Sequence, residues 1–565
     1  PTAPPEEAWP GTAQTDHWRK RTTPEKKRIT FDKAFAPVSV DGRVYFGSSS
    51  DDQLYCLDLK SGEHLWSFFA DAPIRLAPTV AGGQVLFGCD DGHVYSVDAV
   101  SGKLKWKSAL PENVDQQILP GNGRMISLYP IRTGILVRGK TAYFGCGIFP
   151  KNAGAWYCSL DIRTGKILDS KSLDKSLQGY LVDRDGRIFA PTGRDPKGAF
   201  LSKLEQQKQE GKPGSLAALT IPKNYPYSFV TTATQGVGGG DGKVALLSAS
   251  DGSELWQAEV PGIARELAIA DNRLIVSTEG GKILCFGEKG KATVIDRVPS
   301  YSSNISLKEK AADLPDLKKH LTQNKGYALV LNADSDGGEL VNQLVQHTGM
   351  QVVGLVKTVE SADQLRRALA SQKHYGTRVS IQTVTSKLPY RDQCFNLITS
   401  PEVFSGLTSS RVKSLLRPAT GIIWALGSKE PLYRAPELEG TGEWTHMYAD
   451  PGNSACSGDT RVGSSLSLQW FGRPGPQHII DRHLRPTPPL VKNGILITPG
   501  NNYALAVDAW NGTILWEKPI ADMRRIGALR DSGNMVLTDD LLYCAAGSAS
   551  PATDVYTGEE KNRFS

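Results

Sequence analysis

The stretch "CLDLKSGEHLW" (residues 56–66) closes a short unit of sequence that recurs along the chain. It returns as "SVDAVSGKLKW" at 96–106 and as "AVDAWNGTILW" at 506–516. In each copy an alternating apolar strand leads to an Asp, a Gly follows four residues later, and a Trp stands four residues beyond the Gly. The Asp can accept hydrogen bonds from turn amides, and the Gly tolerates positive φ. The pattern therefore predicts a strand–turn–strand unit with a Trp at a fixed place.

Complete and partial copies of this unit lie on both sides of a long interruption. The copies are Asp58/Gly62/Trp66, Asp98/Gly102/Trp106, Asp161/Gly165 with Asp169 in place of the Trp, Ser248/Gly252/Trp256, Asp508/Gly512/Trp516, and Asp554/Gly558 near the end. Each unit exposes apolar faces that only a neighbouring unit can cover. Short sheets arranged around an axis meet this need, so the repeat predicts a mainly β fold, a β-propeller of seven or eight blades.

The interruption has a different periodicity. "SLKEKAADLPDLKKHL" (306–321) and "ESADQLRRALASQ" (360–372) are amphipathic and predict helices, while "YALVLNA", "MQVVGLV", "FNLITS" and "GIIWALG" read as buried parallel strands. Alternating strands and helices predict an α/β, Rossmann-like domain. We therefore expect a propeller in two parts, 1–294 and 431–565, with a domain of residues 295–430 inserted at an exposed turn of one ring.

The amino-acid sequences of the repeats resemble those of a known family. "FGSSSDDQLYCLD", "PIRLAPTV", "FGCDDGHVYSVDA", "PGNGRMISLYPIRTGILV" and "GIFP" are similar to the repeats of bacterial pyrroloquinoline-quinone (PQQ)-like propellers. That group holds both quinoprotein dehydrogenases and scaffold proteins without a cofactor. The resemblance implies the propeller fold and leaves the function open, because the repeat is a packing device.

The inserted segment resembles a class I S-adenosylmethionine methyltransferase domain. "YALVLNADSDGGELVNQLV", "VVGLVKT", "LPYRDQCFNLITS" and "LLRPATGIIWAL" stand in the order of that family's strands. The resemblance implies cofactor contacts at a set of positions: Asp334, Asp336, Gly337, Gly338 and Lys357. The two aspartates replace glycines, Lys357 or Val356 replaces a ribose-binding acid, and Asn396 replaces an Asp. These departures predict a domain that keeps its core and has lost key cofactor contacts.

A quinoprotein dehydrogenase of this fold would need a calcium site and a catalytic Asp. "SSSDDQ", "CDDGH" and "GGGDGK" contain carboxylates, but each lies between alternating strands, where Asp and Gly form turns. We therefore assign no catalytic residue and no metal ligand, and we predict no bound cofactor. Both S-adenosylmethionine and PQQ with calcium are disfavoured.

Composition and charge narrow the class of partner. The chain has 565 residues with a formal net charge of +6 and scattered Lys and Arg, so nucleic acid is not implied. It has no apolar run of about 18 residues, so we predict no integral membrane span and leave membrane association open. The eight cysteines are dispersed. They predict buried free thiols, with one or two disulfides as the alternative.

These observations predict a bacterial binding or scaffold protein that is not an enzyme. The start, "PTAPPEEAWP", is interpreted as a processed end, and a periplasmic or otherwise extracytoplasmic location is expected although no signal peptide is visible. Other envelope proteins are the expected partners. Two alternatives remain: a methyltransferase acting through the insert, and a PQQ-dependent oxidoreductase.

Overall fold

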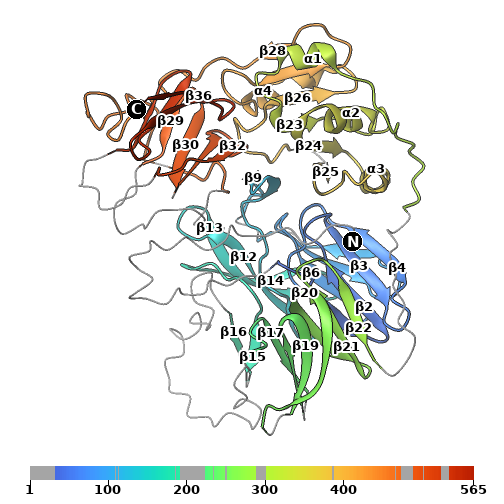
Figure 1. Cartoon of the computed structure of the whole chain (residues 1–565). Helices are drawn as coiled ribbons and strands as arrows, with labels where there is room; N and C mark the ends of the chain where they lie inside the picture. Colours follow the sequence, from blue (N-terminus) through green and yellow to red (C-terminus); the bar gives the residue numbers. More distant parts are fainter. Residues whose placement is uncertain are drawn as a thin grey trace.

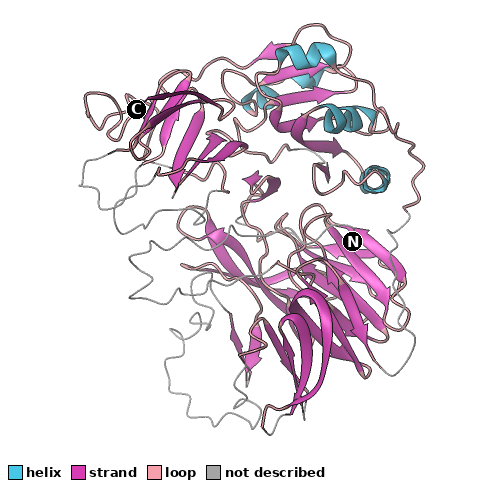
Figure 2. Ribbon diagram, viewed as in Figure 1, coloured by secondary structure: helices cyan, strands magenta, loops and turns pink. Residues whose placement is uncertain are grey.

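The computed structural model describes most of the chain. The described residues are 32–108, 110–111, 114–184, 186–190, 223–232, 235–248, 251–287, 301–384, 387–464, 466–472, 488–500, 502–523 and 533–564. Figure 1 shows antiparallel sheets at both ends of the sequence and a sheet covered by helices between them. Strands dominate, and the few helices gather in the middle of the chain (Figure 2).

Three four-stranded antiparallel sheets follow one another near the N-terminus, each with its strands in sequence order. The first sheet has β1 (Val38–Val40), β2 (Arg43–Gly47), β3 (Gln53–Asp58) and β4 (His64–Phe69); the second has β5 (Thr79–Ala81), β6 (Gln84–Gly88), β7 (Val94–Asp98) and β8 (Leu104–Lys107); the third has β11 (Leu136–Arg138), β12 (Thr141–Phe149), β13 (Gly154–Asp161) and β14 (Ile167–Ser172). This meander is what the repeated strand–turn–strand units predict.

The remaining N-terminal strands form less regular sheets. They are the hairpins β9 (Ile118–Gly121) with β10 (Arg124–Ser127) and β15 (Val182–Arg184) with β16 (Arg187–Phe189), and a six-stranded sheet of β17 (Ser228–Thr231), β18 (Gln235–Gly239), β19 (Asp241–Ser248), β20 (Glu254–Ala270), β21 (Arg273–Thr278) and β22 (Ile283–Phe286). The long strand β20 joins two halves of that sheet. Strands β1–β22 are called the N-terminal body below.

The first sheet is covered on both faces within the N-terminal body. One face packs on the second sheet, where Tyr45 and Cys56 share a buried cluster with residues of β6 and β7. The other face packs on the six-stranded sheet, where Phe46 and Tyr55 share a cluster with Ile275 of β21. The N-terminal units thus close on one another without the C-terminal units.

A mixed six-stranded sheet occupies the middle of the chain. Its order is β25 (Val379–Thr383), β24 (Gly349–Val356), β23 (Lys325–Val330), β26 (Leu397–Ser400), β27 (Ile422–Ala425) and β28 (Tyr433–Arg434), and β28 alone pairs antiparallel. Alternate residues of β23 point to opposite faces: Val330 joins one buried cluster and Leu329 the other. The order of the five parallel strands is that of a doubly wound sheet. We call it the parallel sheet.

Helices α1 (Pro315–His320), α2 (Glu339–His347), α3 (Val359–Ser371) and α4 (Ser410–Ser414) and the 3₁₀ helix η4 (Ser405–Thr408) accompany the parallel sheet. The helix expected over 360–372 corresponds to α3. The helix expected over 306–321 is wrong for its first nine residues. There the backbone runs irregularly along α2, whose Asn342 and Gln346 side chains bind the carbonyls of Lys308 and Glu309. These side-chain hydrogen bonds to backbone carbonyls take the place of the hydrogen bonds within a helix.

Two four-stranded antiparallel sheets follow the parallel sheet: β29 (Leu490–Lys492), β30 (Ile495–Gly500), β31 (Tyr503–Asp508) and β32 (Ile514–Pro519), then β33 (Met535–Leu537), β34 (Leu541–Cys544), β35 (Ser550–Asp554) and β36 (Glu560–Phe564). They share one buried cluster with each other. In Figure 1 they lie beside the parallel sheet, apart from the first sheet. The expected single ring of seven or eight blades is therefore not what the described strands form.

In the described ranges no helix has the length and apolar character needed to cross a membrane, and α3 has 13 residues.

Candidate functional site

The motif aspartates organise their own turns. Asp58 Oδ1 accepts the amides of Lys60 at 2.9 Å and Ser61 at 2.7 Å, and Gly62 has a φ of 73°. Asp98 and Asp161 bind the amides that follow them in the same way. Hydrogen bonds from these amides lower the pKa of all three carboxyls, because they favour the charged form. The motif Asp is thus a turn residue.

Three of the motif tryptophans, Trp66, Trp106 and Trp516, lie over the motif Gly of the next unit. A Cβ on Gly102 would stand 2.5 Å from the Trp66 ring, and one on Gly165 would stand 2.5 Å from the Trp106 ring. Trp106 also donates to the Ile162 carbonyl at 2.9 Å, and Trp516, which lies over Gly558, donates to the Val555 carbonyl at 2.8 Å. The tryptophans therefore serve cohesion between consecutive sheets.

Two other tryptophans depart from the pattern expected from the sequence: Trp256 does not cover a motif Gly, and Trp470 does so although it follows no motif turn. Trp256, which follows Gly252, is 39 % exposed and packs edge-on against Phe286 at 5.3 Å. Trp470 lies over Gly512 and donates to the Ala509 carbonyl at 2.8 Å. Sequence reasoning missed this role of Trp470, because no Asp–Gly turn precedes it.

The repeated tripeptide "PIR" forms a second packing device. Ile74 seats on Gly47, where a Cβ would meet its side chain at 2.3 Å, and Ile131 seats on Gly88 at 2.4 Å. The arginines that follow, Arg75 and Arg132, both reach one buried carboxylate, as described next. The repetition of this tripeptide in the sequence was the available signal for this arrangement.

Asp90 is held between the two "PIR" arginines. Arg75 Nε donates to Asp90 Oδ2 at 2.7 Å, and Arg132 donates Nε to Oδ1 at 3.0 Å and Nη2 to Oδ2 at 2.9 Å. Arg75 also binds Asp32 at 2.5 Å. All four side chains are buried. Asp90 belongs to "CDDGH", which was expected to be turn chemistry alone. Its carboxylate instead forms buried ion pairs with both arginines.

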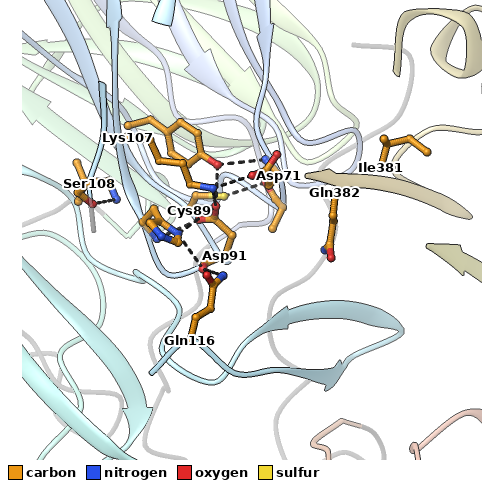
Figure 3. Close-up of polar contacts among 12 residues, drawn as sticks. Asp71, Cys89, Asp91, Lys107, Ser108, Gln116, Ile381 and Gln382 are labelled. Carbon is orange, nitrogen blue, oxygen red and sulfur yellow. Dashed lines mark hydrogen bonds and ion pairs between the residues drawn. The ribbon is translucent and has the colours of Figure 1, made fainter. Parts of the chain in front are cut away.

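A second charge network, partly buried, surrounds Lys107, and Figure 3 shows this side chain between Asp71 and Asp91. Lys107 Nζ lies 2.7 Å from Asp71 Oδ2 and 2.8 Å from Asp91 Oδ2. Arg366 of α3 binds the same Asp71 carboxylate and donates to the Ile381 carbonyl at 2.6 Å. Burial alone would raise the pKa of Asp71, but Lys107 and Arg366 hold it at about 2. This network ties the parallel sheet to the N-terminal body.

The parallel sheet also contacts the C-terminal sheets through a motif turn. Arg417 Nε donates to Asp508 Oδ2 at 2.6 Å, with both side chains buried. Asn511 Nδ2 donates to Asn396 Oδ1 at 2.9 Å, and the same oxygen accepts the Tyr327 amide at 3.0 Å. Asn396, expected as a departure from a cofactor-binding pattern, therefore serves the contact between the two sheets.

The loop at the start of α2 carries four of the expected cofactor positions. Asp336 Oδ1 accepts the Gly338 amide at 2.9 Å, and Oδ2 accepts the Leu340 amide at 2.8 Å. Gly337 and Gly338 have φ values of 68° and 83°, and a Cβ on Gly338 would stand 2.5 Å from Leu365. Burial raises the pKa of Asp336, and the amides oppose that shift. The carboxylate of Asp336 thus occupies the amides that begin the helix.

The structure brings Asp334 into the same loop and leaves Lys357 apart from it. Asp334 is half-buried, and its backbone carbonyl accepts the Gly337 amide at 3.1 Å. Lys357 is exposed at the end of β24, directly before Thr358, whose hydroxyl caps α3 through the Ser361 amide at 3.1 Å. A cation at this position cannot accept hydrogen bonds from ribose hydroxyls.

Removing the Asp336 carboxylate is expected to destabilise α2. Asp336→Ala deletes a capping acceptor, so we expect the free energy of unfolding to fall by about 1 kcal/mol. Chemical denaturation of the purified chain measures it. Asp334→Ala is the matched control, because that side chain makes no hydrogen bond in the described structure. Equal losses from both variants would show that Asp336 does not cap the helix.

A half-buried carboxyl on β20 predicts that the stability of the protein depends on pH. Burial raises the pKa of Glu266 from 4.5 to about 7, with Arg265 opposing the shift. Between these values the folded chain holds a proton that the unfolded chain releases, so stability falls as pH rises through this window. We expect Glu266→Gln to flatten the fall in melting temperature from about pH 4.5 to about pH 8. Glu259→Gln, on the exposed part of the same strand, should leave the profile of the parent unchanged.

The described residues contain no group of three or more His, Cys, Asp or Glu side chains placed to hold a metal ion. All eight cysteines are free: six are buried, and Cys285 and Cys456 are exposed. The acids of "SSSDDQ" and "CDDGH" are bound to other protein groups: Asp51 to the Tyr55 hydroxyl, Asp52 to Arg124, Asp90 to Arg75 and Arg132, and Asp91 to Lys107.

Individual relatives of the chain are distant. The quinone-dependent 1-butanol dehydrogenase of Thauera butanivorans is 24% identical over 172 residues, which are 29% of this chain and 26% of that protein. The chain therefore matches about a quarter of the length of this curated relative. Among solved structures, BamB from Moraxella catarrhalis (18% identity, TM-score 0.22) covers 46% of this chain and 84% of its own. The computationally designed Ika4 protein (13% identity, TM-score 0.23) covers 29% of this chain and 86% of its own.

A family profile gives a more extensive match. The PQQ_2 profile, described as outer membrane protein assembly factor BamB, matches residues 12–196 and 230–387. These ranges include the first three sheets and run on into the parallel sheet. Since the match extends over more than half of the chain, the protein belongs to this BamB-type family of PQQ-like repeat proteins.

Proposed function

We propose that this protein is a non-catalytic, extracytoplasmic binding or scaffold protein that recognises other envelope proteins. The observation that carries the proposal is the glycine loop of the parallel sheet, where the Asp336 carboxylate takes the amides at the start of α2. The middle domain, methyltransferase-like in its strand order, would then be a structural bridge between two sets of sheets.

Both sides of the parallel sheet support a bridging role. Arg366 binds Asp71 of the N-terminal body, and Arg417 binds Asp508 of the C-terminal sheets. The Arg417–Asp508 pair is buried and the Arg366 side chain is buried, so breaking either contact leaves a buried charge without that partner and disfavours other arrangements. Such a domain is held in place at two points, which suits a scaffold better than a catalytic domain that must open for its substrate.

S-adenosylmethionine does not fit the loop as it stands. The cofactor would need loop amides that are already bound to Asp336, and an acid for its ribose where Lys357 stands. Each lost hydrogen-bond partner costs about 1–3 kcal/mol. Two or three such losses would weaken binding by orders of magnitude. An active methyltransferase is therefore the weaker candidate.

The described residues also do not offer the cations and the cluster of oxygen ligands that a quinone cofactor with calcium would need. PQQ carries carboxylates and works with calcium, so it would need unshared cations and a cluster of oxygen ligands. Asp90 already engages Arg75 and Arg132, and the neighbouring acids are bound to protein groups. The quinone dehydrogenase relative thus shares the repeat, and the proposal assigns this chain no redox step.

The family description points to the partner class. The matching profile is described as an outer membrane protein assembly factor. For this chain we propose only the class of partner and the place where it binds. The partner is a protein of the cell envelope, and it binds the loops and edges of the sheets.

Affinity isolation of the tagged chain from envelope fractions tests the proposal. Cross-linking before solubilisation should recover the same partner proteins in repeated preparations. An unrelated exported propeller with the same tag is the control. Recovery of no protein above that control, or a chain found only in the cytoplasmic fraction, would contradict the proposed function.

A further inference from the structure

Two buried cysteines lie side by side in the third sheet. Cys146 is on β12 and Cys158 is on β13, and these strands pair antiparallel, with Cys146 opposite Trp156 and Cys158 opposite Phe144. Residues two apart on a strand point to the same side, so the two cysteines are diagonal neighbours on one face of the sheet. Both belong to the buried cluster between the second and third sheets.

The two thiols contact each other. A hydrogen bond with the Cys158 thiol, together with burial, raises the pKa of Cys146 well above its usual value. Bonded sulfur atoms lie about 2.05 Å apart, so the side chains must still approach for a disulfide to form. A bulge follows Cys146, and it leaves residues 147 and 148 without a ladder partner on β13. The backbone beside Cys146 can therefore adjust as the sulfur atoms approach.

The other cysteines are not placed in this way. All eight lie in the described ranges, and Cys146 and Cys158 alone stand on strands that pair with each other. Cys56 and Cys89 share a buried cluster but lie in different sheets. The Cys89 thiol donates instead to the Ala72 carbonyl at 3.1 Å.

We propose that Cys146 and Cys158 form a disulfide when the chain folds in an oxidising compartment. The step is a thiol–disulfide exchange, with a protein disulfide or a small disulfide as the oxidant. Both S–H bonds and the S–S bond of the oxidant break, and the bond between the two cysteine sulfurs forms. Two electrons and two protons pass to the oxidant, which leaves as two thiols. In the cell the link rests on the extracytoplasmic location proposed above, because such a compartment supplies the oxidant.

Burial decides when the link can form. The thiolate is the attacking species, and the raised pKa keeps Cys146 as a thiol in the folded sheet. In the unfolded chain the thiol has an ordinary pKa of about 8.5 and is open to the oxidant. The two cysteines belong to consecutive strands, so their contact is local and can form early in folding. Burial then protects the finished link from reductants.

The link holds the end of the hairpin in place. Phe149, at the end of the bulge, packs on Phe471 at 5.1 Å, and the neighbouring Trp470 lies over Gly512 of the C-terminal sheets. A bond between β12 and β13 removes the freedom of the bulge to change the register. The redox state of the pair thus reaches the contact between the N-terminal body and the C-terminal sheets.

Refolding of the purified chain tests the pair without regard to its location in the cell. The chain is unfolded and reduced, then refolded with reduced and oxidised glutathione, and free thiols are alkylated. We expect peptide mapping to find Cys146 linked to Cys158 and every other cysteine alkylated. Refolding in a reductant instead should lower the melting temperature by about 5–10 °C, as for the loss of a disulfide that closes a short loop.

Two double variants separate the pair from the other buried thiols. Cys146→Ala with Cys158→Ala should have the same melting temperature after either refolding. Cys56→Ala with Cys89→Ala is the matched control, because these cysteines are equally buried in one cluster. This control should keep the difference in melting temperature that the parent shows.

Either of two results would overturn the proposal. One is a refolded parent in which Cys146 and Cys158 are alkylated, or are linked to different cysteines. The other is a linked parent whose melting temperature equals that of the reduced chain, since the link would then not hold the hairpin. Both leave the scaffold role to the affinity isolation. A chain that links correctly on refolding but is found only in the cytoplasmic fraction would contradict the proposed location and support the pair.

Discussion

Asp90→Ala is expected to lower the free energy of unfolding of the N-terminal body by about 3–5 kcal/mol. The substitution removes the carboxylate that Arg75 and Arg132 share, and it leaves two buried guanidinium groups without that counter-charge. The cost is large because charges buried in protein cannot recover their hydration. Scanning calorimetry, which resolves the transitions of separate parts, measures the loss.

Asp58→Ala is the matched control for this prediction. Asp58 is also a carboxylate between strands of the first units, but it is half-buried and binds the turn amides and the Ser61 hydroxyl, with no arginine as partner, so about 1 kcal/mol should be lost. Asp90→Asn keeps the shape of the side chain and removes its charge. It should approach the loss seen for alanine. A loss below about 1 kcal/mol for both Asp90 variants would contradict the structural role of the ion pair.

Arg417→Ala is expected to loosen the C-terminal sheets, again at a cost of about 3–5 kcal/mol. Asp508 is fully buried, and its Oδ2 loses its cation while Oδ1 keeps the Trp510 amide at 2.9 Å. The two sheets should then become easier to remove by limited proteolysis in the exposed segment 451–464. Faster cleavage there and an earlier thermal transition are the expected readouts.

Arg163→Ala provides the comparison for Arg417. Arg163 also pairs with a motif aspartate, Asp161, at 3.4 Å, but that pair is exposed to solvent. Exposed pairs contribute about 0–1 kcal/mol, so this variant should behave as the parent protein does. If both arginine variants gave the same small change, the contact between parallel sheet and C-terminal sheets would not depend on the buried pair.

The repeat could be predicted from sequence because its signals are local. Asp58 and Gly62 act within one turn, and the alternation of β3 is visible in six residues. The placement of the C-terminal sheets could not be predicted in the same way. It depends on Arg417 reaching Asp508, two residues 91 positions apart whose pairing no periodicity reveals. The helix expected at 306–321 is wrong over its first nine residues for a related reason, since side chains of α2 bind backbone carbonyls there.

The positions of the candidate-site residues could be predicted from the sequence, but their hydrogen bonds and ion pairs could not. The sequence placed Asp334, Asp336, Gly337 and Gly338 in one loop, where the structure also has them. The replacement of glycines by Asp334 and Asp336 predicted lost cofactor contacts, and in the structure Asp336 is bound to amides of the loop and of α2. The networks around Asp90 and Asp71 went unnoticed, because their partners come from separate units and from α3.

Calorimetric titration of the purified chain with S-adenosylmethionine tests most directly whether the middle domain is structural. With the α2 amides bound to Asp336 and a lysine at the end of β24, no saturable heat should appear at cofactor concentrations up to the millimolar range. Saturable binding in the micromolar range, at one site per chain, would contradict the proposal that this protein is a non-catalytic scaffold.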